Sequence, residues 1–325
     1  MNRRRRLIVA LGAGTFSAPL GALAQQMRSI PVVAVLNLDA AHRVESLRQG
    51  LRELGYVEGR NVRLETRNPG DRYARLPQIA SEFVQLKVDV IVTFGSTATL
   101  TASKVTSTIP IVMVAGVDPV KEKLAASLGR PGGNVTGVAT ILQDLSAKRL
   151  ELAKEAFAGL TAVGVLWNSE SRTSALALVD TQEAAKRLGL QLHAVEIRAA
   201  ADFSKAFETL ARNRITVFVL LNSNMFVANR PQLLESAARN RLVGVFAGSG
   251  WIDHASALLS YGTNPSADDR QAAVYVDKIL KGAKPGDLPI EQPTTFELIV
   301  NVKTAKALGI KIPQSILVRA DKVIQ

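Results

Sequence analysis

The sequence predicts an α/β protein with two lobes, each built on a parallel β-sheet. Short runs rich in Val and Ile alternate with segments whose apolar residues recur at helical spacing, as in βαβ units. This alternation occurs twice along the 325 residues. Corresponding points, such as Gly55 and Gly189 at the ends of two helical segments, lie about 130 residues apart. Two similar lobes therefore explain the pattern better than one long sheet, although residue identities do not repeat.

The first half contains four predicted strands and three predicted helices. The run at residues 30–37 is rich in β-branched residues, which is typical of a buried parallel strand. The next segment places apolar residues from Val44 to Leu54 on one helical face and ends at Gly55, a common helix stop. In chain order we expect a strand at 30–37, a helix at 44–54, a strand at 62–66, a helix at 76–86, a strand at 88–94, a helix at 98–105 and a strand at 109–114.

The second half repeats this order and continues into a tail. The tail begins after Gly282, where a last long helix stops. The expected elements are strands at 162–167, 191–197, 215–221, 242–246 and 296–301, and helices at 175–188, 203–212, 231–240, 267–280 and 303–308.

Two segments are predicted to carry the chain from one lobe to the other. Residues 130–137, Arg-Pro-Gly-Gly-Asn-Val-Thr-Gly, mark a turn into an extended segment. We place the first crossing just beyond it, near residues 138–142. A second crossing is expected near residues 260–265.

Residues 1–24 have the pattern of an export signal. Four arginines at positions 3–6 precede an apolar run at 7–20, and Ala22 and Ala24 provide the small residues that a signal peptidase reads before Gln25. The run is short and interrupted by glycines, so we expect no stable membrane insertion after its removal. The arginines fit both the general secretory and the twin-arginine route. The mature chain is therefore expected in the periplasm.

Composition excludes several classes of protein. There are no cysteines, which excludes disulfides, thiolate-held zinc, iron–sulfur clusters and a cysteine nucleophile. The three histidines lie far apart, so a histidine-rich metal site is not expected. No cofactor is expected either. The net charge of +12 includes the four arginines of the signal, and the other basic residues are scattered. Nucleic-acid binding needs a clustered basic surface, so no nucleic-acid partner is expected.

Polar loops at the carboxyl ends of the predicted strands are the candidate ligand site. Open parallel sheets bind ligands at this edge, and backbone N–H groups at the following helix can hold an anion. Gly, Ser and Asn also cap helices and make turns, which is the competing explanation for any one of them. The candidate ligand-binding residues are Asp39, Gly95, Ser96, Thr97 and Asp118 in the first lobe and Trp167, Asn168, Asn222, Ser249 and Tyr261 in the second.

No catalytic constellation is recognisable. There is no Gly-x-Ser-x-Gly elbow and no phosphate-binding loop ending in Gly-Lys-Ser/Thr. Asp253 and His254 are neighbours in sequence, so their side chains are not expected to face each other. We therefore expect no enzyme, while a secreted enzyme on a two-lobe scaffold and a ligand-binding partner of a sensor remain as alternatives.

Several motifs resemble one family over essentially the whole mature chain. The motifs lie at residues 50–62 (Gly-Leu-Arg-Glu-Leu-Gly-Tyr-Val-Glu-Gly-Arg-Asn-Val), 131–137, 260–262, 273–282, 289–294 and 305–310. Together they resemble the periplasmic substrate-binding proteins of ABC transporters, and within these an uncharacterised transport family whose better-known members bind tryptophan or tyrosine. At residues 222–225 this chain has Asn-Ser-Asn-Met, where a family member often has an Asp-Pro pair. The ligand of this chain can therefore differ from the ligands of its relatives.

The resemblance implies a type I periplasmic binding protein fold with three crossovers. It implies one lobe of residues 30–140 and 263–288, and a second of 141–262 and 289–325. It also implies a monomer that binds a small molecule, such as an amino acid, and docks on ABC permease subunits. For such a ligand, the amides at Ser96 and Thr97 would suit a carboxylate and Asp118 an ammonium. Trp167, Phe94 and Trp251 are candidates for stacking, and core packing explains Phe94 equally well.

Overall fold

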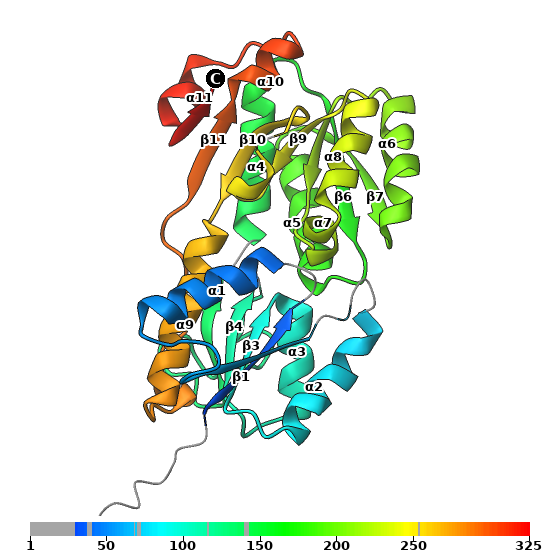
Figure 1. The fold of residues 1–325 in the computed structure, drawn as a ribbon. Helices are drawn as coiled ribbons and strands as arrows, with labels where there is room; N and C mark the ends of the chain where they lie inside the picture. Colours follow the sequence, from blue (N-terminus) through cyan, green and yellow to red (C-terminus); the bar gives the residue numbers. More distant parts are fainter. Residues whose placement is uncertain are drawn as a thin grey trace, which may run out of the picture.

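The computed structural model describes residues 30–325 except 38–40, 68, 70–72, 116, 140–142 and 253. The predicted export signal and Asp39 lie outside the described residues. The chain forms two lobes, each a sheet covered by helices (Figure 1). The predicted α/β class with two parallel-dominated sheets is confirmed.

The first lobe has a five-stranded parallel sheet in the order β2-β1-β3-β4-β5. Its strands are β1 (Val32–Asn37), β2 (Arg63–Arg67), β3 (Val90–Phe94), β4 (Ile111–Ala115) and β5 (Val135–Ala139). The helices of this lobe are α1 (Ala41–Glu53), α2 (Leu76–Gln85), α3 (Ser96–Val105) and α9 (Pro265–Leu280), with the 3-10 turns η2 (Tyr73–Arg75) and η5 (Pro285–Asp287).

Helices cover both faces of this sheet, which explains why β3 is buried at every residue. On one face Val33 and Val92 pack among residues of α1 and α9, such as Leu47 and Val276. The opposite face packs on α2 and α3, where Phe83 is fully buried. The Val- and Ile-rich runs form strands because these faces exclude water.

The second lobe has a seven-stranded sheet in the order β12-β11-β10-β9-β8-β6-β7. All pairs are parallel except β10 with β11. Its strands are β6 (Ala162–Asn168), β7 (Gln191–Ile197), β8 (Val217–Leu220), β9 (Val243–Phe246), β10 (Ala257–Gly262), β11 (Glu297–Asn301) and β12 (Lys322–Ile324). Its helices are α4 (Gln143–Ala156), α5 (Arg172–Arg187), α6 (Phe203–Arg212), α7 (Asn224–Ala228), α8 (Arg230–Arg239), α10 (Val302–Ala307) and α11 (Gln314–Arg319), with the 3-10 turns η3 (Ala200–Asp202) and η4 (Ser249–Trp251).

Two core clusters lie on opposite faces of this second sheet. On one face Val165 and Val219 pack among Leu150 of α4 and Ala177 of α5. The other face is aromatic, with Phe207, Phe218 and Phe246 in successive edge contacts. The lobe thus repeats the layered plan of the first, as the sequence pattern predicts.

Some elements were not predicted. β5 was expected only as an extended segment. β10 overlaps the first three residues of the predicted second crossing, and the chain crosses directly after it. The other elements that were not predicted are α4, α7, α11 and β12. In β5, Gly137 has φ +126° and lies so close to β4 that an added Cβ would be 2.3 Å from the Met113 carbonyl oxygen. A glycine is needed there for the strands to pair, which is why this Gly-containing segment is a strand after all.

The chain passes between the lobes near Thr263 and again after Glu291. Asn264 caps α9 with its side-chain oxygen and donates to Glu297 across the two crossing strands. The amide of Glu291 donates to Gly137 O at 2.9 Å and its carbonyl accepts from Ala139 N, so residues 290–291 still belong to the first sheet. We therefore propose that the third crossing follows Glu291, so that residues 289–291 belong to the first lobe and not, as expected from the sequence, to the second.

Candidate functional site

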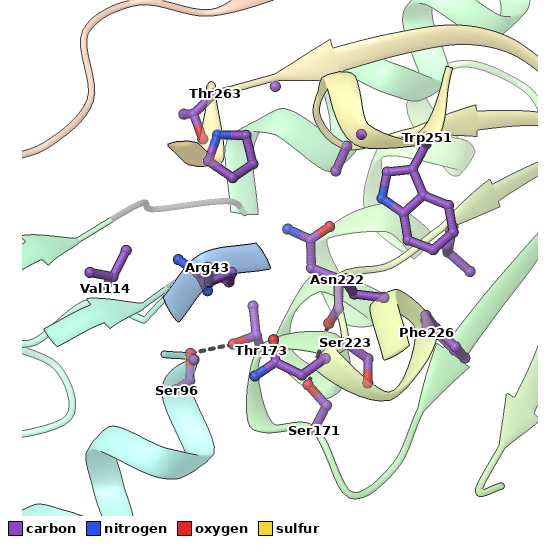
Figure 2. Close-up of a pocket in the computed structure, with 18 of the residues that line it drawn as sticks. Arg43, Ser96, Val114, Ser171, Thr173, Asn222, Ser223, Phe226, Trp251 and Thr263 are labelled. Atoms are coloured by element: carbon purple, nitrogen blue, oxygen red, sulfur yellow. Dashed lines mark hydrogen bonds between the residues drawn. The ribbon is translucent and has the colours of Figure 1, made fainter. Parts of the chain in front are cut away.

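A cavity of about 170 Å³ lies between the two lobes (Figure 2). It is larger than the ~150 Å³ hole that holds a benzene ring in an engineered protein core. Residues from α1 and α3 line it on one side, and residues from the β8, β9 and α5 ends line it on the other. The lining residues include Arg43, Tyr73, Gly95, Ser96, Thr97, Arg149, Ser171, Thr173, Asn222, Ser223, Asn224, Phe226, Trp251, Thr263 and Asp268.

The first-lobe rim is the turn between β3 and α3. Gly95 has φ +98°, and an added Cβ would lie 2.5 Å from the Asn224 amide nitrogen of the other lobe. Ser96 begins α3 and is buried. The turn therefore needs a glycine for its backbone and for the close approach of the second lobe.

Polar contacts between described residues join the lobes around the cavity. The hydroxyls of Ser96 and Thr173 share a hydrogen bond, drawn in Figure 2. The Asn224 amide donates to the Phe94 carbonyl at 3.0 Å. Further out, Arg172 pairs with Glu122 at 3.0 Å. The structure is therefore a closed arrangement of the lobes.

A cation from α1 lines the first-lobe side. Arg43 forms an ion pair of 2.6 Å with the fully buried Asp269 of α9 and lies 4.4 Å above the Phe94 ring. Burial raises the pKa of the Asp269 carboxyl, and Arg43 opposes this rise. The pair cross-links α1 and α9 beside the cavity.

A second cation, the buried Arg149 of α4, also lines the cavity. Its Nε donates to the Tyr261 carbonyl at 2.8 Å, whereas its Nη2 has no hydrogen-bond partner among the described residues. Burial lowers the pKa of this guanidinium to about 10. It therefore stays charged at neutral pH.

The second-lobe wall combines an aromatic surface with polar groups. Trp251 stacks on Phe246 with ring centroids 5.1 Å apart, and Phe226 lies beside it. Asn222, Ser223 and Ser171 lie on the same side of the cavity (Figure 2). Tyr73 of η2 packs on the cores of both lobes. Such a wall suits a ligand with an apolar part and several polar groups.

Four of the predicted site residues line this cavity, namely Gly95, Ser96, Thr97 and Asn222. The structure brings these four small or polar residues together at the carboxyl ends of parallel strands, and their binding role stays a prediction. Asp39 lies outside the described residues. Ser249 lies in η4 next to Trp251, and its side chain is outside the described part.

The other predicted residues do not line the cavity. Asp118 is not among the residues that line it, and its Oδ1 accepts from the amides of Val120 and Lys121, which caps its own turn. Asn168 is buried and donates to the Ile197 carbonyl at 3.0 Å. Trp167 packs against the core of the second lobe.

Tyr261 also differs from the expectation. Its ring lies 6.2 Å from that of Phe296, and its contribution near the cavity is its carbonyl, which accepts from Arg149. Of the three aromatic residues named from the sequence as candidates for stacking, Trp251 lines the cavity, whereas Trp167 and Phe94 do not.

Sequence reasoning missed Arg43, Arg149 and Thr173. Arg149 lies among buried residues of α4, such as Leu145, Leu152 and Ala153. A lone Arg on the apolar face of a helix is the signal that points to it. Among the described residues no cluster of acidic or histidine side chains is arranged to hold a metal ion. In the same part of the chain, no helix has the length and apolarity needed to cross a bilayer.

Comparisons with known proteins agree on one family. The model of the family described as ABC transporter substrate binding protein matches residues 5–324. A tyrosine-binding protein of Clostridioides difficile (strain R20291) is 27% identical over 263 residues, which are 81% of this chain and 75% of the relative.

Solved structures give the same fold. A conserved domain protein from Vibrio cholerae O1 biovar El Tor has a TM-score of 0.82 at 28% identity, covering 91% of this chain and 100% of that one. An ABC domain in complex with L-Trp from Streptococcus pneumonia has a TM-score of 0.81 at 22% identity, with the same coverage. The fold is that of a type I periplasmic binding protein, as the sequence motifs implied. The chain belongs to the ABC transporter substrate-binding protein family.

Proposed function

We propose that this protein captures an amino acid, or a related small carboxylate, between its lobes outside the cytoplasm and delivers it to the permease subunits of an ABC importer. The observation that supports this most directly is the cavity between two lobes that also contact each other across it. A solute that touches both lobes stabilises the closed state, whereas a solute touching one lobe does not shift the balance. Closure is the signal that such a protein presents to a transporter.

The choice of an amino acid rests on the lining and on the relatives. Cationic and hydroxyl groups surround the cavity on both lobes, and Trp251 and Phe226 provide an apolar wall. The tyrosine-binding relative and the neighbour solved with L-Trp carry ligands that combine a carboxylate with an aromatic ring. Residues 222–225 depart from a common family pattern, so the proposal does not extend to which amino-acid side chain the protein prefers.

Residues 1–24 are proposed to be removed on export, leaving a monomer that works in the periplasm. The protein is proposed to return its ligand unchanged and to use no cofactor, metal or nucleic acid. The secreted-enzyme and sensor-partner alternatives have no observation of their own in the cavity.

The test is a binding screen on residues 25–325. L-tyrosine, L-tryptophan, the other common amino acids and aromatic acids are screened by thermal shift, because a ligand that binds the native state raises Tm. Hits are measured by calorimetry, by small-angle scattering for compaction, and by chromatography for recovery of intact ligand. Failure of the whole panel to raise Tm contradicts the amino-acid function, and consumption of a hit contradicts a purely binding role.

A further inference from the structure

The least satisfied group near the cavity is the guanidinium of Arg149. The residue is 1% exposed, and one face of its fork is fixed by the hydrogen bond from Nε to the Tyr261 carbonyl. Nη2 is buried with no partner among the described residues. A buried cation with an unused donor is costly, and native proteins keep such a group when something else completes it.

No carboxylate of the described chain supplies that partner. Asp269 is engaged with Arg43 at 2.6 Å, and Asp268 accepts from the Thr263 hydroxyl at 3.0 Å. Within the part of the chain that the structure describes, no acidic group lies within ion-pair distance of Arg149. The counter-charge for this cation is therefore missing from its surroundings.

Arg149 also lines the cavity between the lobes. Its planar fork matches a carboxylate, which accepts two parallel N–H bonds. Orientation by the Tyr261 carbonyl means that little side-chain freedom is lost when such a bond forms.

We propose that Arg149 is the carboxylate anchor of the cavity, so the second lobe holds the anionic end of the ligand and selects carboxylate-bearing solutes over their neutral analogues. This rests on the proposed function. It reassigns the carboxylate from the α3 N-terminus, where the Ser96 hydroxyl is already bonded to Thr173. The remaining part of the ligand then extends toward the Arg43 and Ser96 side of the first lobe.

The first test changes the ligand and leaves the protein intact. L-tyrosine and L-tryptophan are compared with their carboxamides by calorimetry at pH 6, where the α-amine is protonated in all four. The amides keep the ring and the ammonium and lack only the negative charge. We expect them to bind at least 100-fold more weakly, since a buried charged partner is left unpaired.

The second test changes the anchor. Arg149→Met is expected to weaken L-tyrosine or L-tryptophan binding about 100-fold and to reduce the discrimination between acid and amide to a few-fold. Arg149→Lys keeps the charge without the fork and is expected to fall between. Arg187→Met, an exposed arginine at the end of α5, is the matched control and keeps wild-type affinity. The ligand-free Tm of each variant shows that the fold is intact.

These experiments distinguish a failure of the Arg149 anchor from a failure of the proposed amino-acid binding. Equal binding of acid and amide, or full affinity in a folded Arg149→Met, overturns the anchor while solute binding stands. If the wild-type protein binds none of the amino acids or aromatic acids, the proposed function fails and the anchor fails with it.

Discussion

The hydrogen bond of Asn224 between the lobes allows their closure to be tested by a single substitution. Its amide, from the second lobe, donates to the Phe94 carbonyl of the first at 3.0 Å. Because this bond exists only in the closed state, Asn224→Ala removes stabilisation from that state alone. A neutral hydrogen bond contributes about 0.5–1.5 kcal/mol net. The closed population, and with it the apparent affinity, should fall by roughly 2- to 13-fold.

The assay is calorimetric affinity for the best hit of the ligand screen, with the ligand-free Tm measured alongside. The ligand-free Tm should change little, since neither lobe loses an internal contact. Asn213→Ala is the matched control, because its amide donates to the Thr209 carbonyl within one helix end at 2.9 Å. An unchanged affinity in Asn224→Ala, or an equal loss in Asn213→Ala, would refute the reasoning.

Three further changes test separate parts of the structure. Gly137→Ala places a Cβ 2.3 Å from the Met113 carbonyl oxygen, and urea titration should show a free energy of unfolding lower by about 2–4 kcal/mol. Gly55→Ala is the control, because Gly55 also has a positive φ but has open space around it. It should lower the free energy of unfolding by only about 1–2 kcal/mol. Arg172→Ala removes the exposed ion pair with Glu122 and should weaken ligand affinity less than about 5-fold, and not at all in 1 M salt; a large loss that persists in salt contradicts a surface pair. Burial and the hydrogen bond to Asp277 raise the pKa of Tyr56 to about 12, above its ordinary value of 10. The stabilisation by this tyrosine is therefore complete below pH 10 and is lost as the pH rises to about 12. Tyr56→Phe should be less stable than wild type at pH 8, and the difference in stability should close between pH 10 and about 12.

Two elements have the bounds that the sequence predicted, namely α6 and β7. In α6 the buried residues Phe203, Ala206, Phe207 and Leu210 recur at helical spacing, which is the signal that the prediction used. β7 is an edge strand with only Ile197 fully buried, so its bounds come from its β-branched and apolar residues and the turns around it. β10 was not predicted, although the crossing expected near residues 260–265 directly follows it in the structure. Its strand character comes from pairing with β9 and β11, which no local pattern reveals.

Some residues of the site could be predicted from the sequence and others could not. Ser96 and Asn222 follow strands, so their place at the sheet edge follows from topology. Arg43 and Arg149 lie inside helices, where an arginine is usually a surface residue. Their position beside the cavity depends on which face each helix turns to the sheet and on how the lobes meet.

The strength of the contacts between the lobes bears on how the protein releases its cargo. The hydroxyl pair and the Asn224 bond contribute about 0.5–1.5 kcal/mol each, and the exposed ion pair about 0–1 kcal/mol. Together they amount to about 1–4 kcal/mol, well below the ~8 kcal/mol of a micromolar ligand. These three contacts by themselves thus hold the lobes together weakly, while the buried charge of Arg149 makes the empty closed state costly. A ligand that neutralises this charge tips the balance to closure, and its loss to a transporter tips it back.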